Sequence, residues 1–404
     1  MLSPDLLFSA PMHSRAPDGA ALGRAGTEAL RRGDPARARE AFRQAVAERP
    51  GDAGLWLGLA YACRGAQDPG AMGEAADRVL ALDAANVRAQ ILKGDALEAL
   101  GDTRAASAWY LAALRGAPTP AQQPEDLARE LRRAREQAGR HARQYEEHLR
   151  SSLAGRGFGP AQADSRFAES LEILFGRRRI YVQQPRYYYF PGLPQRQFYD
   201  RAAFPWLDAL ESATDAIREE LQAVLAEAES FAPYVQRSPD RPHHAQQGML
   251  DNPDWSAFYL WRNGVPVADN AARCPRTLAA LEAVPLARLP NRSPTVLFSQ
   301  LRPGAHIPPH HGMVNTRLIC HLPVIVPGRC RFRVGNDVRE WQAGRAWVFD
   351  DTIEHEAWND SDRTRVVLLF DVERPELDEQ ERAYVRAMFE AIDAYSGTPP
   401  AWDV

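Results

Sequence analysis

Small and large apolar residues recur with a period of 34 residues between Leu22 and Pro118. This spacing is typical of repeated helix pairs, in which small residues let two helices cross closely and a large apolar residue lies on the second helix. We therefore predict a short solenoid of about three helix pairs. The positions in register are Gly33–Asp34, Gln67–Asp68 and Gly101–Asp102; Gly26, Ala60 and Gly94; Phe42, Ala76 and Tyr110; and Ala45, Val79 and Ala113.

The repeat resembles the tetratricopeptide pattern, with a degenerate middle copy in which Met72 and Ala76 replace the usual small and large residues. The concave side of such a solenoid can hold a peptide, so we expect a peptide or protein substrate as a partner. A helical bundle that only caps the next domain is the alternative. Further helices are expected at 125–153, which is rich in Arg, Glu and Gln, and at 161–175.

The period of apolar residues changes to two from Thr295 onward, which predicts β-strands. The odd-numbered residues from Arg317 to Ile325 face one side, and the even-numbered residues from Leu318 to Val324 face the other. Both sides are largely apolar, as in a strand that is covered on both faces. Arg317 and His321 then point into the interior, where each needs a partner charge or a metal. Many short strands predict a sandwich or a jelly-roll barrel, with helices at 204–232, 276–284 and 376–392 around it.

Composition narrows the class of protein. The 404 residues are 45% hydrophobic and 25% charged, with a net charge of −4 and a pI near 6.2, which argues against a nucleic-acid binder. Four cysteines lie far apart without a CxxC pair, so a disulfide framework is not expected and a cytoplasmic location fits. We expect no signal peptide, because the N-terminal residues lack a basic region followed by an apolar core. We also expect no membrane span, because no run of about 18 apolar residues occurs.

Two histidines and an arginine carry the candidate chemistry. His310 and His355 are 45 residues apart at turns between apolar alternating runs, and Arg365 follows ten residues after the second. This layout suggests a barrel that holds a metal and an anionic cosubstrate. Non-haem iron oxygenases hold iron with two His and usually one carboxylate. The carboxylate normally comes two residues after the first His, where this chain has Gly312.

Four segments resemble the aspartyl/asparaginyl β-hydroxylase family of Fe(II)- and 2-oxoglutarate-dependent dioxygenases: LRPGAHIPPHHG, NTRLICHLPVIVPG, WVFDDTIEHEAWN and RTRVVLLFDVERPEL. The resemblance covers about residues 295–377, and YFPGLP and FPWLDALE upstream also resemble bacterial members, many of which carry tetratricopeptide repeats. That family lacks the carboxylate ligand and uses two His with water in its place. Gly312 therefore agrees with the family.

The resemblance assigns roles by position. His310 and His355 resemble the iron ligands, and Arg365 falls where the family's Arg binds the distal carboxylate of 2-oxoglutarate. Ser299 and His321 match residues that contact the same cosubstrate. We therefore expect Fe(II), 2-oxoglutarate and O₂ as cofactors and cosubstrates.

The substrate side departs from the family pattern. Arg317 matches an Arg that faces the substrate acid, and the well-studied peptide hydroxylases carry a second Arg two residues later. This chain has Ile319 there, which puts an Asp or Asn side chain as substrate in doubt.

Four neighbouring polar residues have weaker assignments. His311 is the fallback for the first iron ligand, and His306 is expected to be structural. Asp350 and Asp351, just before His355, could orient a ligand or a bound water, or could be ordinary turn residues.

The implied fold is α+β, with a helical tetratricopeptide solenoid followed by a double-stranded β-helix of the jelly-roll or cupin type. We expect a flexible tail at 1–20, repeats at 21–120, a helical cap or linker at 121–176 and the dioxygenase domain at 177–404, with its barrel core at 295–377.

The expected activity is hydroxylation of an amino-acid side chain, with an Asp/Asn-type side chain of a peptide or protein first. A free amino acid such as proline, or a lipid acyl chain, is the alternative substrate. A halogenase, which also has a small residue in place of the carboxylate, and a non-enzymatic scaffold of repeats and barrel are further alternatives.

Overall fold

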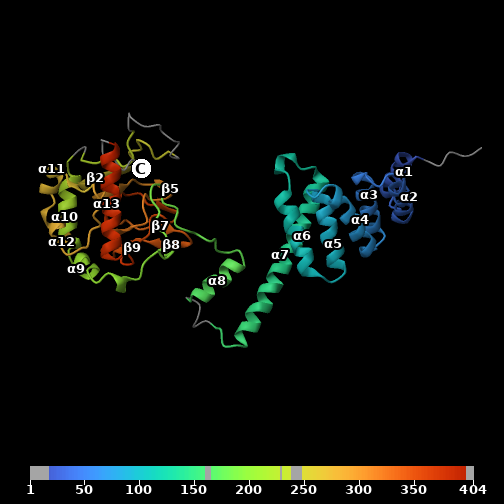
Figure 1. The fold of residues 1–404 in the computed structure, drawn as a ribbon, viewed down its shortest axis with the longest axis horizontal. Helices are drawn as coiled ribbons and strands as arrows, with labels where there is room; N and C mark the ends of the chain where they lie inside the picture. The colour runs from blue at the N-terminus through green and yellow to red at the C-terminus, as the bar shows by residue number, and fades with distance from the viewer. Residues whose placement is uncertain (1–17, 160–164, 228–229, 238–247, 397–404) are drawn as a thin grey trace, which may run out of the picture. The chain divides into compact units, whose positions relative to one another are not determined.

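The computed structural model describes residues 18–159, 165–227, 230–237 and 248–396. The chain divides into two compact units, Met1–Leu171 and Glu172–Val404 (Figure 1). Most of the predicted tail at 1–20 lies outside the described residues. Within the described residues, no helix is long and apolar enough to cross a membrane.

Six helices of 13 or 14 residues form the repeats of the first unit, each packed on the next (Figure 1). The predicted helix pairs are thereby confirmed. The helices are α1 (Gly19–Arg31), α2 (Pro35–Glu48), α3 (Ala53–Gly65), α4 (Pro69–Leu82), α5 (Val87–Ala99) and α6 (Thr103–Gly116).

The dipeptides in register form the turn inside each helix pair. Asp34, Asp68 and Asp102 cap the second helices, and each carboxylate accepts a hydrogen bond of 2.9–3.1 Å from the amide three residues later. This bond satisfies one amide that has no partner within the helix. The residue before each Asp has a positive φ between 57° and 88°, which reverses the chain between the helices.

The small and large positions of the repeat meet at the helix crossings. A Cβ atom on Gly26 would lie 2.7 Å from the ring of Phe42, and one on Gly94 would lie 2.6 Å from the ring of Tyr110. Glycine is therefore required where an aromatic ring fills the crossing. The degenerate middle copy has Ala76, fully buried, where the other copies have the ring.

Two helices follow the repeats. The long charged helix α7 (Glu125–Ala154) has the predicted extent and packs its apolar face, which includes Leu127 and Leu131, against α6. A short 3₁₀ turn at Pro120–Gln122 precedes it. Helix α8 (Arg166–Leu174) is shorter than the prediction of 161–175, whose first residues lie outside the described part of the chain.

The second unit contains two antiparallel sheets, which confirms an α+β chain with helical repeats before β-sheets. The larger sheet has the strand order β1-β2-β4-β11-β6-β9, with β3 paired to β2, and the smaller has the order β5-β10-β7-β8. The strands are β1 (Ala232–Pro233), β2 (Trp255–Arg262), β3 (Val265–Pro266), β4 (Val296–Leu301), β5 (His306–His310), β6 (Arg317–Ile325), β7 (Cys330–Val334), β8 (Asp337–Glu340), β9 (Trp347–Phe349), β10 (His355–Asn359) and β11 (Arg365–Glu373).

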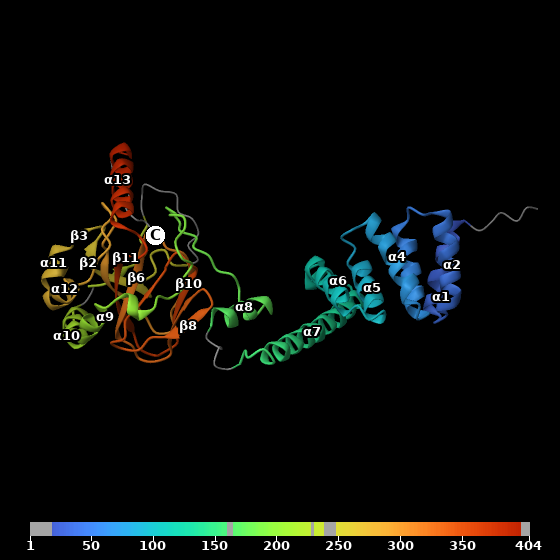
Figure 2. The ribbon, with the colours of Figure 1, turned by 60° about the horizontal axis from the view of Figure 1, so that its bottom comes forward.

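Helices cover the outer face of the larger sheet, where they gather along one side of the strands (Figure 2). Apolar residues of these helices and of the sheet form one core, and a second core lies between the two sheets. The helices of this unit are α9 (Leu207–Ser212), α10 (Thr214–Leu225), α11 (Ala268–Ala272), α12 (Pro275–Leu281) and α13 (Glu379–Ser396), with a 3₁₀ turn at Arg201–Ala203.

Strand β6 has the two faces that its sequence predicts. Leu318, Cys320, Leu322 and Val324 belong to the core beneath the helices. Arg317, Ile319 and His321 face the space between the sheets. Ile325 departs from the prediction, because an irregularity in the pairing with β11 precedes it and it packs against the core beneath the helices. Both faces are covered, which is why the strand is apolar on both.

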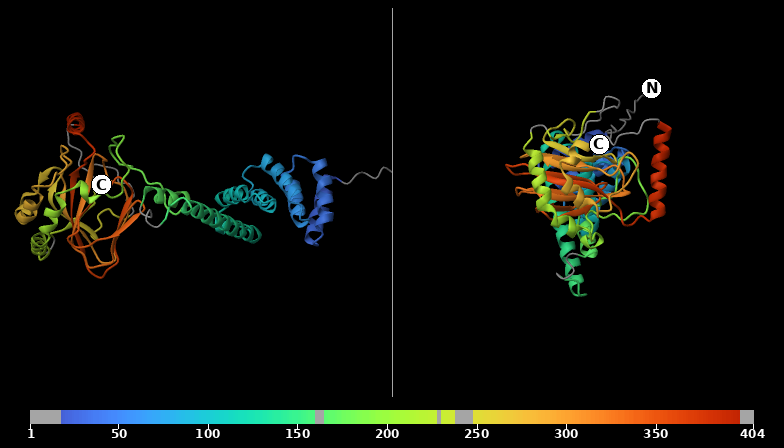
Figure 3. Two further views of the ribbon diagram at one scale, coloured as in Figure 1. Left: turned by 90° about the horizontal axis from the view of Figure 1, so that it is seen from below. Right: turned by 90° about the vertical axis from the view of Figure 1, so that its left-hand side faces the viewer.

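Helix α13 lies apart from these layers, at the edge of the unit (red in Figure 3). Its residues Val385 and Phe389 are buried against Leu289 and Val314 and against the aromatic segment around Tyr188. Helix α13 thereby packs against the segment around Tyr188, which precedes the sheets in sequence.

Candidate functional site

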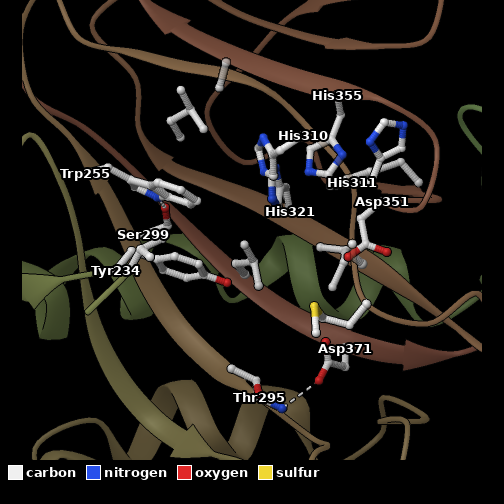
Figure 4. A pocket seen from close by; sticks show the side chains of 18 of the residues that line it. Tyr234, Trp255, Thr295, Ser299, His310, His311, His321, Asp351, His355 and Asp371 are labelled. Atoms are coloured by element: carbon white, nitrogen blue, oxygen red, sulfur yellow. Dashed lines mark hydrogen bonds between the residues drawn. The ribbon is translucent and has the colours of Figure 1, made fainter. Parts of the chain in front are cut away.

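A cavity of about 310 Å³ lies between the two sheets (Figure 4). Side chains from both sheets line it, so residues that are distant in sequence meet there. All six residues assigned from the sequence line this cavity: Ser299, His310, Arg317, His321, His355 and Arg365.

His310 and His355 lie side by side on neighbouring strands. They are directly paired residues of β5 and β10, and their ring centroids are 4.0 Å apart (Figure 4). Nδ1 of His310 is 2.8 Å from the carbonyl oxygen of Pro308, and Nδ1 of His355 is 3.1 Å from that of Ile353. When each Nδ1 donates its proton to the carbonyl oxygen, the lone pair of each Nε2 can bind a metal ion.

Burial keeps both imidazoles neutral. It lowers the pKa of His310 to about 4 and holds the pKa of His355 well below its usual value, with the neighbouring histidine as a further cause for His355. Both rings therefore have an unprotonated nitrogen at pH 7, which metal binding requires. Among the described residues, no group of three or more His, Cys, Asp and Glu could hold a metal ion, so the candidate set consists of these two rings.

Arg365 forms a buried cationic site at the same cavity. It is 1% exposed, its guanidinium lies 4.4 Å from the ring centre of Trp341, and Nη1 donates to the carbonyl oxygen of Ser299 at 3.3 Å. Its Nε is buried without a hydrogen-bond partner in the described structure, and burial lowers the Arg365 pKa to about 10. A buried guanidinium that lacks a counter-charge fits a bound carboxylate.

Ser299 and His321 flank this cation. The Ser299 hydroxyl accepts a hydrogen bond from Nε1 of Trp255 at 3.2 Å. Neither ring nitrogen of His321 has a partner in the described structure, and burial lowers its pKa well below the usual value. Buried polar atoms without partners are uncommon in proteins, so these nitrogens also point to a ligand in the cavity.

Position 312, where other iron oxygenases carry a carboxylate ligand, has no room for a side chain. A Cβ atom on Gly312 would collide with the carboxylate of Asp351, and the Gly312 amide donates to the Asp351 carbonyl oxygen at 2.7 Å. Asp351 therefore occupies the space into which a side chain at position 312 would extend. No carboxylate ligand can be restored there without moving Asp351.

The structure separates the two aspartates that the sequence could not distinguish. Asp350 is fully buried away from the cavity, where its carboxylate accepts hydrogen bonds from Arg374, Gln183 and Thr352. Asp351 lines the cavity, and burial raises its pKa to about 6. Asp350 is thus a structural residue of this turn, and Asp351 belongs to the site.

The remaining histidines of the turn also differ. His306 is exposed, stacks on Trp358 and lies 3.0 Å from Glu356, as expected of a structural residue. His311 lines the cavity beside the histidine pair (Figure 4).

Sequence reasoning missed several residues of the cavity. Asp371 faces it from β11, an even number of residues after Arg365, so the strand alternation could have identified it. Trp255 and Tyr259 also line the cavity, and Tyr234 stacks on Trp255 with ring centroids 4.2 Å apart. No local signal in the sequence places Tyr234 there, because it follows the two-residue strand β1 outside any regular element.

Part of the second unit is similar to known proteins. Residues 211–375 match the family described as Aspartyl/Asparaginyl beta-hydroxylase. The chain is 38% identical over 180 residues to an ornithine lipid ester-linked acyl 2-hydroxylase of Rhizobium tropici, covering 44% of this chain and 60% of the relative. It is 30% identical over 216 residues to the human aspartyl/asparaginyl beta-hydroxylase, covering 50% of this chain and 27% of the relative.

The repeats resemble solved structures, but with low TM-scores over the whole chain. The first tetratricopeptide domain of Spaghetti (RPAP3), solved with an HSP90 peptide, has a TM-score of 0.26 and 18% identity, covering 31% of this chain and 96% of that domain. The 34-residue period and the helix pairs themselves, rather than this score, identify the tetratricopeptide repeats. The matched region, which follows these repeats, is thus similar to the aspartyl/asparaginyl beta-hydroxylase family.

Proposed function

We propose that this chain is an Fe(II)- and 2-oxoglutarate-dependent dioxygenase that hydroxylates an amino-acid side chain of a peptide or protein. One observation carries the proposal: two neutral imidazoles and a buried guanidinium without a counter-charge line the same cavity. A metal site beside a buried guanidinium suits a cosubstrate that chelates the metal and also carries a free carboxylate.

His310 and His355 would hold the iron through Nε2. The hydrogen bonds of their Nδ1 atoms to Pro308 and Ile353 fix the ring orientation before metal binding. When bound, iron with 2-oxoglutarate and O₂ would supply the oxidising chemistry for an unactivated C–H bond, with succinate and CO₂ as co-products.

Arg365 would bind the distal carboxylate of 2-oxoglutarate. Its guanidinium lies over the ring of Trp341, and Phe332 and Phe349 form an aromatic wall around the neighbouring His321. A charge-assisted pair is stronger in such an environment than in solvent. Ser299 and His321 would complete the cosubstrate site.

The substrate would enter on the side of Arg317 and Ile319. Side chains of the Asp/Asn type are the first substrates to test, because the matched family carries that name. The acyl chain of a lipid is the second candidate, since the Rhizobium relative is named for such an activity and is 38% identical. We assign this chemistry to residues 177–404, with its core at 295–377.

The repeats would hold a peptide. A groove of about 780 Å³ lies on the repeat unit, and its walls carry both charges and the apolar Met72. Charged and apolar walls together suit a peptide segment better than a small apolar ligand.

Succinate formation tests the proposal. The purified full-length chain should convert 2-oxoglutarate to succinate with Fe(II) and O₂, and a host lysate should yield a product heavier by one oxygen by mass spectrometry. His310→Ala is the matched negative control. A silent assay despite verified iron binding would favour the scaffold, and a chloride-dependent product would favour a halogenase.

A further inference from the structure

A buried cluster of one arginine and two aspartates lies on the substrate side of the cavity. Nη1 of Arg317 is 2.9 Å from Oδ2 of Asp351, and its Nε is 3.1 Å from Oδ1 of Asp371. The three residues are 7%, 7% and 3% exposed, and all three line the cavity. Figure 4 shows the two carboxylates on the side away from Trp255, with Asp371 held by the Thr295 amide.

The cluster carries one more negative charge than positive when its groups are ionised. Arg317 faces both carboxylates at ion-pair distance, so it compensates one of them. Asp371 also accepts hydrogen bonds from the Ser293 hydroxyl at 2.6 Å and from the Thr295 amide at 2.8 Å. Oδ1 of Asp351, in contrast, is buried at the cavity without a hydrogen-bond partner in the described structure. A buried carboxylate oxygen of this kind calls for a donor from a ligand.

Among the described residues that line the cavity, Arg365 is the only buried cation besides Arg317. Ile319 is paired with Asp371 across β6 and β11, so the position next to this carboxylate is apolar. Arg365 lies six residues before Asp371 on β11, which separates their backbones by roughly 20 Å along the strand. At that distance, its charge is a weak counter-charge for Asp371.

The other charged residues of the cavity wall lie in contact with solvent. Arg237 is exposed and lies 3.4 Å from Asp251, and Arg262 is exposed over the ring of Tyr259. Solvent screens exposed charges more than buried ones. The cluster therefore sets the charge in the buried part of the substrate side.

We propose that Asp351 and Asp371 select a substrate that presents a positively charged nitrogen group, an ammonium or a guanidinium, to this cavity. Arg317 holds the two carboxylates in place and does not bind an acid of the substrate. A substrate carboxylate would meet Asp351 and an arginine that is already compensated. This preference rests on the function proposed above and narrows its substrate away from acidic side chains.

Three small probes of equal length test the preference: n-butylamine, n-butanol and butyrate. Each is small enough for the cavity whatever the rest of the natural substrate is. Binding is measured by calorimetry at pH 7.5 with the full-length protein, Mn(II) and saturating 2-oxoglutarate, so that Arg365 is occupied. We expect the amine to bind roughly tenfold or more tightly than the alcohol, and butyrate no more tightly than the alcohol.

Asparagine variants assign the preference to the cluster. Asp351→Asn should weaken amine binding roughly tenfold and leave the alcohol unchanged, because it removes the charge and keeps the shape. Asp371→Asn should act in the same direction. Asp254→Asn, at an exposed position outside the cavity, is the matched control and should change nothing. Ile319→Arg should shift the preference toward butyrate.

The outcomes separate this preference from the proposed function. If butyrate binds as tightly as the amine, or if none of the probes binds, the preference is wrong, whereas succinate formation by the wild type still supports the dioxygenase. If the chain binds no 2-oxoglutarate and forms no succinate, the dioxygenase itself is wrong.

Discussion

Arginines line both the groove of the repeat unit and the cavity between the sheets. Arg64 and Arg133 of the groove form ion pairs, whereas Arg365 of the cavity forms none with the described residues. In the groove, both terminal nitrogens of Arg133 donate to Asp95 at 2.6 and 2.7 Å, and Arg64 reaches Asp95 and Glu130. In the cavity, Arg365 and His321 are more deeply buried and retain nitrogen atoms without partners in the described structure.

The difference indicates where a ligand contributes to the structure. Paired, partly exposed charges stabilise a fold modestly and need nothing further. Buried polar atoms without partners destabilise it, so they persist where a bound group supplies the missing interaction. The groove is therefore stable without the peptide that we propose for it, whereas the cavity retains buried polar atoms that a bound group would satisfy.

Loss of either histidine should have the largest effect. His310→Ala or His355→Ala should lower succinate formation more than about a hundredfold, since even the partners of metal ligands change affinity by 10–100-fold. His306→Ala is the control, because His306 stacks on Trp358 outside the cavity and should retain most of the turnover. Full succinate formation in His310→Ala would refute the proposed metal site.

Arg374 lies in the same unit as Arg365 but is paired, so its loss should lower the stability of the fold. Arg374 and Asp350 are fully buried, with Nη1 of Arg374 2.7 Å from Oδ2 of Asp350. Arg374 also donates to the Tyr199 hydroxyl. Arg374→Met leaves a buried carboxylate without its counter-charge, so we expect a loss of roughly 3–5 kcal/mol in the free energy of unfolding. Urea unfolding measures it, and a loss below about 1 kcal/mol would contradict the structural role.

Arg365→Met should spare the fold and damage cosubstrate binding. The substitution removes a buried cation that lacks a counter-charge, so the free energy of unfolding without ligand should stay equal or rise. The KM for 2-oxoglutarate should rise more than about tenfold, because a charge-assisted contact is lost. An unchanged KM would exclude Arg365 from the anion site.

Arg133→Met should have the smallest effect. It removes one partly exposed ion pair of the groove, so we expect a loss of about 1 kcal/mol in the stability of the repeat unit by urea unfolding. Succinate formation without added substrate should not change. A fall in this basal turnover would show that the groove contributes to the chemistry.

The sequence by itself determined the features that depend on spacing along one element. The 34-residue period located the helix pairs, because each repeat must place its small and large residues at the same crossing. Alternation along β6 identified the inward face that carries Arg317 and His321, since neighbouring residues of a strand point to opposite sides. The motifs around His310, His355 and Arg365 located residues that the fold brings to one cavity.

The tertiary structure alone decided which side chains meet across elements. Adjacent residues Asp350 and Asp351 have similar sequence contexts, yet the turn directs one to Arg374 and the other to Arg317. The pairing of Asp371 with Arg317 depends on the register of β11 against β6, which no local pattern specifies. Charge balance in a buried cavity is a sum over strands distant in sequence, so it becomes visible only once their positions are known.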